Sequence, residues 1–250
     1  MGGIVLVTGA GRGIGAAIAR GAGRQGYAVA VNYARSAAGA DAVVEDIKKG
    51  AGKAVAVKAD MTNEADIVAL FETIDRTLGP VTHLVNNAGI IGEKSSARAI
   101  TGAAIDTLLR TNVAGPFLCI REAAKRMSTE TGGKGGAIVN IGSIAARLGG
   151  FPGFAGYAAS KAAIDGLTIA LAKELGPQGI RVNTVRPGLT GTDMLDIPAS
   201  ADTIANLAKT SVPYGGRVAR PEEIAALVLS LLSDEASYVS GAIYDVSAGR

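Results

Sequence analysis

The segment "VTGAGRGIG" (residues 7–15) is a glycine-rich turn between two regular patterns. The apolar run before it, "IVLVT" (4–8), predicts a buried strand, and "GAAIARGAGRQG" (15–26) predicts a helix. Glycines at such a junction let the backbone turn tightly and approach a pyrophosphate, which lies at the positive end of the helix. Gly9, Gly13 and Gly15 follow G-x-x-x-G-x-G, not the commoner G-x-G-x-x-G. In its strand–turn–helix setting, this motif favours nucleotide binding.

Short β-branched runs alternate with helical patterns along the rest of the chain. Further strands are predicted at 28–32, 53–60, 81–89, 135–143, 180–188 and 241–247, and helices at about 37–50, 64–79, 101–127, 157–175 and 222–234. Such alternation implies βαβ units and a parallel sheet, and continuous apolar strands imply a sheet covered on both faces. The prediction is a single Rossmann-type, doubly wound α/β domain over residues 1–250, with a seven-stranded, mostly parallel sheet and helices on both faces.

Composition excludes several classes of function. The net charge is only +3, and the densest basic stretch, "REAAKRM" (121–127), lacks interleaved aromatic residues, so no nucleic acid partner is expected. No apolar stretch approaches the length of a membrane span, so no membrane partner is expected either. The one cysteine, Cys119, is expected in the core and fits a reducing compartment, which favours a cytoplasmic protein. A single Cys and a single His (His83) leave no transition-metal cluster, so no metal site is predicted.

The end of the second strand bears on the choice of cofactor. An NAD enzyme usually has a carboxylate there for the ribose 2′-hydroxyl, but "VNYARSAAG" (31–39) contains no acid. Instead Arg35 and Ser36 follow Tyr33, and Arg12 lies in the glycine turn. Two guanidiniums that meet at the end of this strand would bind a 2′-phosphate, whereas a carboxylate there would repel it. NADP(H) is therefore favoured over NAD(H); the alternative is that these are two surface arginines.

A Tyr and a Lys stand four positions apart in "GYAASKAAIDGL" (156–167). This spacing places Tyr157 and Lys161 on one face of a helix. On its own the pair is weak evidence for an active site, because a solvent-exposed polar face of a helix would show the same spacing. Ser143, in "NIGS", closes the fifth strand, and "NNAG" (86–89) closes the fourth, so both lie at the edge where open parallel sheets bind ligands.

These motifs together resemble the classical short-chain dehydrogenase/reductases. The resemblance runs from Ile4 to Gly249 and rests on "TGAGRGIG", "NNAG", Asn112, Ser143, Y-x-x-x-K at Tyr157 and Lys161, and "RPG" at 186–188. Within that family the sequence looks most like the bacterial 3-oxoacyl-carrier-protein reductase and glucose-1-dehydrogenase-like members.

The resemblance implies four catalytic residues. Tyr157 would be the general acid in carbonyl reduction and the base in alcohol oxidation. Lys161 and the oxidised nicotinamide would lower the pKa of Tyr157, and Lys161 would also bind the nicotinamide ribose. Ser143 would hydrogen-bond the substrate oxygen, and Asn112 would hold the water of a proton relay through Lys161.

The resemblance and the phosphate argument together give a cofactor-binding set. Its members are Gly9, Arg12, Gly13, Ile14, Gly15, Tyr33, Arg35, Ser36, Asp60, Met61, Asn87, Ala88, Gly89, Tyr157, Lys161, Pro187, Gly188, Thr190 and Thr192. Asp60 and Met61 resemble the pair that contacts adenine, and the segment from Pro187 resembles the one that fixes the carboxamide. Thr190 departs from the family pattern, which more often has Ile or Val there.

The expected function is NADP(H)-dependent hydride transfer between nicotinamide and a small-molecule carbonyl or secondary alcohol. A sugar or polyol dehydrogenase working oxidatively and a non-catalytic nucleotide-binding scaffold stay as alternatives. A carrier-protein substrate is less favoured, because Lys134 stands alone and Gln178 falls where a base would help. Residues 189–215 are expected to form a lid over the nicotinamide. The resemblance also implies a homotetramer or homodimer.

Overall fold

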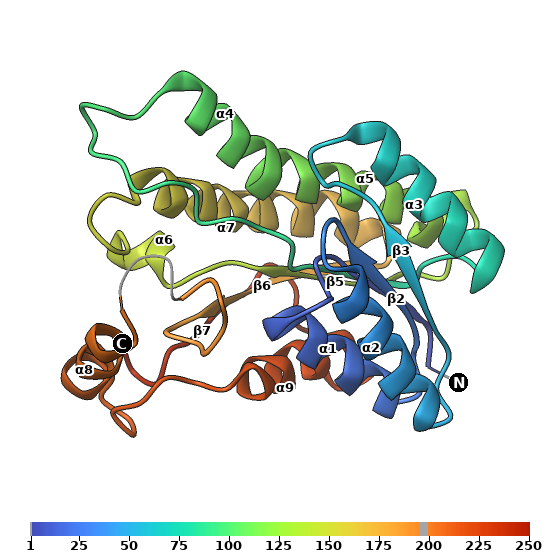
Figure 1. The fold of residues 1–250 in the computed structure, drawn as a ribbon. Coiled ribbons are helices and arrows are strands. Elements are labelled where there is room, and N and C mark those ends of the chain that lie inside the picture. The colour runs from blue at the N-terminus through green and yellow to red at the C-terminus, as the bar shows by residue number, and fades with distance from the viewer. Residues whose placement is uncertain (1, 196–199) are drawn as a thin grey trace.

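The computed structural model of the protein describes residues 2–195 and 200–250. Over these residues a seven-stranded sheet runs in the order β3-β2-β1-β4-β5-β6-β7, and every pairing is parallel (Figure 1). The strands are β1 (Ile4–Val7), β2 (Ala28–Tyr33), β3 (Ala54–Lys58), β4 (His83–Asn86), β5 (Gly136–Ile141), β6 (Ile180–Pro187) and β7 (Ile243–Val246). The predicted doubly wound, seven-stranded Rossmann-type fold is confirmed, and its sheet is wholly parallel.

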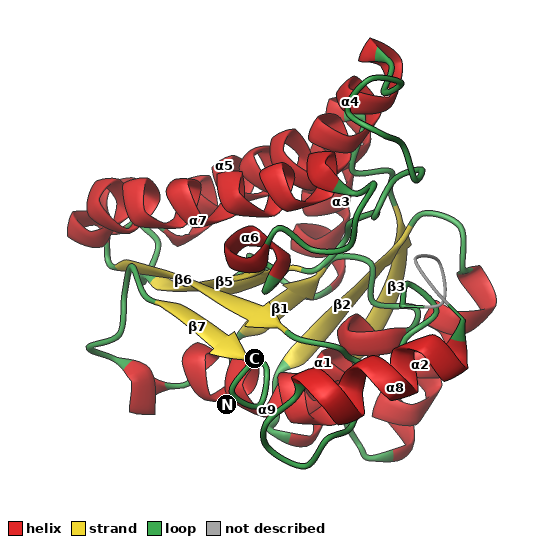
Figure 2. Cartoon of the chain, turned by 90° about the vertical axis from the view of Figure 1, so that its left-hand side faces the viewer, coloured by secondary structure: helices red, strands yellow, loops and turns green. Residues whose placement is uncertain are grey.

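Helices cover both faces of the sheet. They are α1 (Gly13–Arg24), α2 (Ala37–Lys49), α3 (Glu64–Thr77), α4 (Gly102–Leu109), α5 (Gly115–Met127), α6 (Ala145–Leu148), α7 (Ala155–Leu175), α8 (Ala201–Ser211) and α9 (Pro221–Leu232). Buried side chains of α1, α2 and α9 form one core with the sheet, and those of α3, α5 and α7 form the core on the other face. Figure 2 shows the sheet between these two layers.

Strand β1 shows why a continuous apolar run forms a central strand. Val5, Leu6 and Val7 are all fully buried. Successive side chains point to opposite faces, so Val5 and Val7 join one core and Leu6 joins the other. The strand order reverses direction at β1, between β2 and β4. Ligands of open α/β sheets bind in the crevice at the carboxyl ends of the strands at such a switch point.

The predicted helix over 101–127 is interrupted. A π-helical turn, Arg110–Ala114, separates α4 from α5. Pro116 has no N–H to donate to the carbonyl of Asn112 one turn earlier, so the regular hydrogen-bond ladder cannot pass this point. The buried side chain of Asn112 is bonded to the backbone of Ile90, which holds the distortion in place.

The predicted strand over 81–89 is also too long, since β4 ends at Asn86. The next two backbone N–H groups, of Asn87 and Ala88, leave the ladder and donate to the hydroxyl of Thr8 at 2.9 and 3.0 Å. The other predicted strands agree with the observed ones to within two residues at each end. Helices α6 and α8, by contrast, lie in segments for which no helix is predicted.

Cys119 is fully buried in the core, and burial raises the pKa of its thiol to about 12, so it is an inert core side chain as expected. No helix over residues 2–195 and 200–250 combines the length and apolar character needed to cross a bilayer. Within the same described ranges, no three His, Cys, Asp or Glu side chains gather as a metal site would require.

Candidate active site

The glycine turn after β1 forms a cradle of bare backbone. Gly9 and Gly13 have positive φ values of 62° and 56°, which side-chain-bearing residues rarely adopt. A Cβ on Gly9 would lie 3.0 Å from the Cα of Ala88, and one on Gly13 would lie 3.1 Å from the side chain of Thr192. The first turn of α1 contains no acid, and its N-cap residue, Arg12, makes no side-chain cap. The amides of this helix end are therefore available to an anion.

Two polar side chains, one in β2 and one directly after β4, hold this turn in place. Asn32, buried at the end of β2, accepts from the N–H of Gly9 at 3.1 Å and donates to the carbonyls of Val57 and Ala59. The amide of Asn87 donates to the carbonyl of Gly9 at 3.1 Å. The sequence reasoning missed Asn32, whose only signal is a polar residue at the end of an otherwise apolar strand run.

The two arginines predicted to bind a 2′-phosphate differ in their surroundings. Arg35 has no ion-pair partner in the described part of the chain, and its charge contributes to lowering the pKa of Asp60, after hydrogen bonds from Thr62. Arg12 instead forms a 2.7 Å ion pair with Asp193, a residue of the predicted lid. Both arginines line one cavity, and the guanidinium of Arg12 is bonded to Asp193.

Ser143 and Tyr157 lie at the carboxyl edge of β5 and in the first turn of α7. The Ser143 hydroxyl accepts from the N–H of Ala145 at 3.1 Å. Burial raises the pKa of Tyr157 above its usual value, and a hydrogen bond with Ser143 acts in the opposite direction. The phenol is therefore protonated at neutral pH, and the predicted lowering of its pKa, which requires oxidised nicotinamide beside it, stays a prediction.

Lys161 lies one turn after Tyr157 on α7, with its ammonium 5.9 Å from the centroid of the tyrosine ring. The ammonium donates to the carbonyl of Ile141 at 2.7 Å. Burial lowers the pKa of Lys161 to about 8, and the nearby carboxylate of Asp165 opposes this shift. The charge of Lys161 consequently titrates close to neutral pH.

Asn112 lies behind this group. Its oxygen accepts from the N–H of Ile90 at 2.9 Å, and its amide donates to the carbonyl of Ile90 at 2.8 Å and to the hydroxyl of Ser160 at 3.0 Å. A Cβ on Gly89 would lie 3.2 Å from the Asn112 oxygen and 3.5 Å from the Lys161 ammonium. The Asn112 side chain is thus already bonded to protein groups, and a relay water would need another atom to hold it.

One cavity of about 970 Å³ joins these parts. Every predicted catalytic and cofactor-binding residue lines it except Gly15 and Asn112. Gly15 lies beneath the turn, where a Cβ would meet the amide of Asn87, and Asn112 lies behind Gly89. The cavity lining also includes Asp193 and Arg250, which no motif had indicated.

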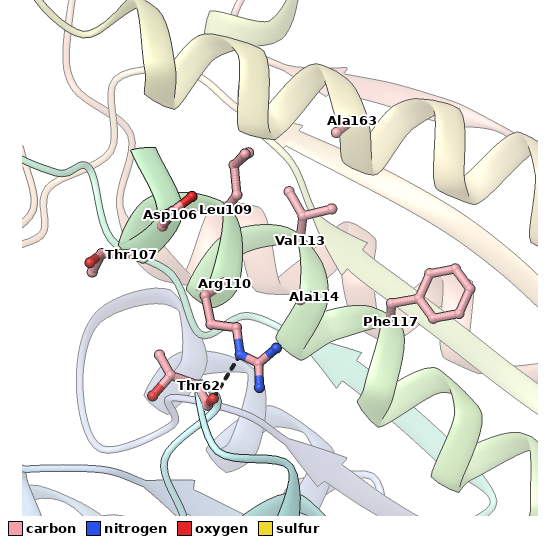
Figure 3. Close-up of a pocket in the computed structure, with 9 residues that line it drawn as sticks. All are labelled: Thr62, Asp106, Thr107, Leu109, Arg110, Val113, Ala114, Phe117 and Ala163. Carbon is pink, nitrogen blue, oxygen red and sulfur yellow. Dashed lines mark hydrogen bonds between the residues drawn. The ribbon is translucent and has the colours of Figure 1, made fainter. Parts of the chain in front are cut away.

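A second hollow, of about 770 Å³, lies outside this cleft on the surface formed by α4, the π-helical turn, α5 and α7 (Figure 3). Its lining is mostly apolar and includes the exposed Leu109 and Phe117. Arg110 donates to the backbone carbonyl of Thr62 at 3.0 Å at its edge.

The fold and the cleft together define a doubly wound α/β protein with a Ser–Tyr–Lys group in the cleft at the carboxyl edge of its sheet. A family model described as "Enoyl-(Acyl carrier protein) reductase" matches residues 9–250. The chain is 44% identical over 247 residues to the uncharacterised oxidoreductase YgfF of Escherichia coli K12, covering 99% of both chains. It is 38% identical over 244 residues to the 3-oxoacyl-[acyl-carrier-protein] reductase FabG of Staphylococcus aureus, covering 98% of this chain and 96% of that one.

Among solved structures, a short-chain dehydrogenase from Burkholderia cenocepacia J2315, in complex with NADP, matches with a TM-score of 0.89 and 35% identity. That match covers 98% of this chain and 96% of the other. The chain therefore belongs to the short-chain dehydrogenase/reductase family and is an oxidoreductase of that family.

Proposed function

We propose that the protein transfers hydride between NADP(H) and a carbonyl or secondary alcohol substrate, with Tyr157 as the general acid and base. The observation that carries this proposal is that Ser143, Tyr157 and Lys161 line the same cavity as the glycine turn. A nucleotide anchored at the turn and a substrate at the tyrosine would thus share one enclosed space.

The residues present fit a nicotinamide dinucleotide. Bare backbone at Gly9 and Gly13 leaves room for a pyrophosphate, and the N-terminus of α1 supplies N–H donors. The bound cofactor would supply the hydride to the carbonyl carbon during reduction, or accept it during oxidation. Arg35, the absence of an acid at the end of β2, and the NADP bound by the Burkholderia relative support NADP(H) over NAD(H).

The chain's own groups handle the proton. In reduction, the protonated phenol of Tyr157 donates its proton to the substrate oxygen as the C–O bond becomes single. Ser143 holds that oxygen by a hydrogen bond as negative charge develops on it. The Lys161 ammonium, buried beside the tyrosine ring, stabilises the phenolate that remains, and the proton is then replaced from solvent. In oxidation the same groups act in reverse.

We also propose a cytoplasmic homotetramer or homodimer. The surface of α4, α5 and α7 supports self-association, because the exposed apolar side chains of Leu109 and Phe117 line the hollow of Figure 3 and Ile169 of α7 is exposed as well. Residues 189–215 are proposed as the lid; residues 196–199 of this segment lie outside the described residues.

The test is a fluorescence titration with NADPH and with NADH, followed by rate measurements on a panel of carbonyl compounds. The panel includes a 3-oxoacyl thioester, because the FabG relatives are named for that substrate. Tyr157→Phe should abolish turnover and keep NADPH affinity, whereas Tyr238→Phe, at a fully exposed tyrosine, should behave as the parent does. Equal rates for Tyr157→Phe and the parent would refute the acid–base role, and NADPH binding without any turnover would favour a scaffold.

A further inference from the structure

The end of the cleft beyond Ser143 and Tyr157 is lined by apolar side chains from three segments. Ile144 directly precedes α6, and Leu148 is the last residue of this helix. Phe151 and Phe154 lie in the loop before α7. Leu189 and Leu195 belong to the predicted lid. The Ser143 hydroxyl accepts a hydrogen bond from the N–H of Ala145, the first residue of α6, so this wall begins directly at Ser143. These six side chains therefore make most of the boundary next to the reacting oxygen apolar.

This wall is supported by a small hydrophobic core of its own. Leu189 is buried with Ala208 of α8 and with Val212, the residue after α8, and Phe151 and Leu195 pack against the same cluster. The cluster is separate from the two cores that flank the sheet. Packing between α8, the loop before α7 and the segment after β6 thus supports the apolar wall.

Several hydroxyl groups on the cavity lining donate to backbone carbonyls of their own segment. Thr107 donates to the carbonyl of Ala103 at 2.9 Å, Thr111 donates to that of Thr107 at 2.8 Å, and Thr190 donates to that of Gly188 at 3.2 Å. These protons are therefore engaged in bonds to the protein. The hydroxyls of Ser143 and Tyr157, by contrast, donate to no backbone carbonyl in the described part of the chain.

The acidic residues of the described lining lie at the cofactor end. The carboxylate of Asp60 accepts from Thr62, and that of Asp193 is paired with Arg12. At the α6 end the lining includes Arg250, whose carbonyl accepts from Arg147 at 2.7 Å. The described lining at the substrate end thus contributes no Asp or Glu side chain that could bind a row of hydroxyl groups.

From this lining we infer that the substrate carbonyl is carried by apolar substituents, alkyl or aryl, and not by the polyhydroxylated chain of a sugar or polyol. This inference rests on the proposed function. A polyol would lose its water at this wall and find no partners for its hydroxyl groups, whereas an alkyl or aryl group would bury its surface. A hydrophobic pocket of this kind discriminates about 100-fold against an added hydroxyl group.

The test compares ketones with one carbon skeleton. 2-Butanone and erythrulose, its trihydroxy counterpart, are reduced with NADPH under the same conditions, together with the larger 4-phenyl-2-butanone. The expected kcat/KM is at least about 100-fold higher for the apolar ketones than for erythrulose. Erythrulose reduced as well as, or better than, 2-butanone would overturn the inference.

Variants of the wall connect the preference to these side chains. Leu148→Asn and Phe151→Asn should lower kcat/KM for 4-phenyl-2-butanone about tenfold, with little change for erythrulose or in the Kd of NADPH. Leu148 is 45% exposed, so its replacement should not disturb folding. Tyr238→Asn, at an exposed site outside the cleft, is the matched control. Unchanged discrimination in both wall variants would also overturn the inference.

A binding measurement separates failure of this inference from failure of the proposed function. If no ketone is reduced although NADPH binds, the proposed function is wrong. Calorimetry with NADP⁺ present then compares 4-phenyl-2-butanol with erythritol. Tighter binding of the aryl alcohol, weakened in Leu148→Asn, still supports an apolar ligand class for the cleft. Equal affinities for the two alcohols would refute it.

Discussion

Arg12 and Asp193 form an ion pair of 2.7 Å, although 181 positions separate them in the chain. Arg12 lies in the glycine turn that precedes α1, and Asp193 lies in the predicted lid. The guanidinium proposed to bind the cofactor's 2′-phosphate is therefore held by a carboxylate from the opposite side of the cleft. A phosphate and a carboxylate compete for the same donors, so we expect the position of the proposed lid and the binding of a 2′-phosphate to be coupled.

Removing the carboxylate of Asp193 should therefore strengthen the binding of NADPH but not that of NADH. Asp193→Asn frees Arg12, and because the pair is 73% and 70% exposed it is worth only about 0–1 kcal/mol. The Kd of NADPH should fall about two- to fivefold, and that of NADH should stay the same. Fluorescence titration measures both. Asp202→Asn, which removes another acid of the lid, serves as the control; an equal gain for NADH would show that Asp193 acts on something other than the phosphate.

Loss of Arg12 and Arg35 should weaken the binding of NADPH more than that of NADH. Hydrogen bonds to a charged group contribute about 1.5–3 kcal/mol, so Arg35→Ala should weaken NADPH binding by about 10- to 100-fold and NADH binding much less. Arg12→Ala combined with Arg35→Ala should remove the remaining preference. Arg98→Ala, at an exposed arginine that does not line the cleft, is the control. Parallel losses for the two cofactors would mean that neither arginine binds the 2′-phosphate.

Asn112 should stabilise the fold through the π-helical turn. Its replacement by Ala leaves the N–H and carbonyl of Ile90 and the hydroxyl of Ser160 without these partners. The expected loss in the free energy of unfolding is about 1–3 kcal/mol. Urea unfolding measures it, with Asn206→Ala on the exposed face of α8 as the control. Stability equal to the parent would show that the Asn112 bonds are not what holds this turn.

The sequence predicts the sheet well because its signals are local. Alternation of apolar strands with amphipathic helices requires a covered parallel sheet, and polar motifs at strand ends then meet at one edge. Helix boundaries are less predictable where tertiary contacts override periodicity. The break at Asn112 depends on a bond to Ile90, and α8 depends on packing against Phe151 and Leu195.

The sequence did not predict those parts of the site that depend on contacts between residues far apart in the chain. Asp193 carries no motif, and its significance comes only from the approach of Arg12 across the cleft. Asn32 looks like an ordinary strand-end residue until its bonds to the glycine turn and to the end of β3 are seen. The pKa of Lys161 is likewise set by burial, which residue spacing does not reveal.

Burial of the Lys161 charge beside Tyr157 should lower the free energy of unfolding of the protein. Its pKa is about 8 in the folded protein, against about 10.4 in an unfolded chain. Below pH 8 both states are protonated, and folding carries the full penalty of burying the charge. Between pH 8 and about 10.4 the unfolded chain binds a proton that the folded protein has released, so the free energy of unfolding rises with pH.

Lys161→Met should therefore abolish turnover and yet stabilise the fold. The charge penalty corresponds to about 3 kcal/mol and the lost hydrogen bond to Ile141 offsets part of it, which leaves a gain of about 1–2 kcal/mol at pH 7. The gain should shrink as the pH rises from 8 to about 10.4, because the lysine of the parent loses its charge. Urea unfolding at several pH values measures this, with Lys173→Met, at an exposed position of α7, as the control. A stability difference that does not change with pH would refute the burial of a titrating charge at Lys161.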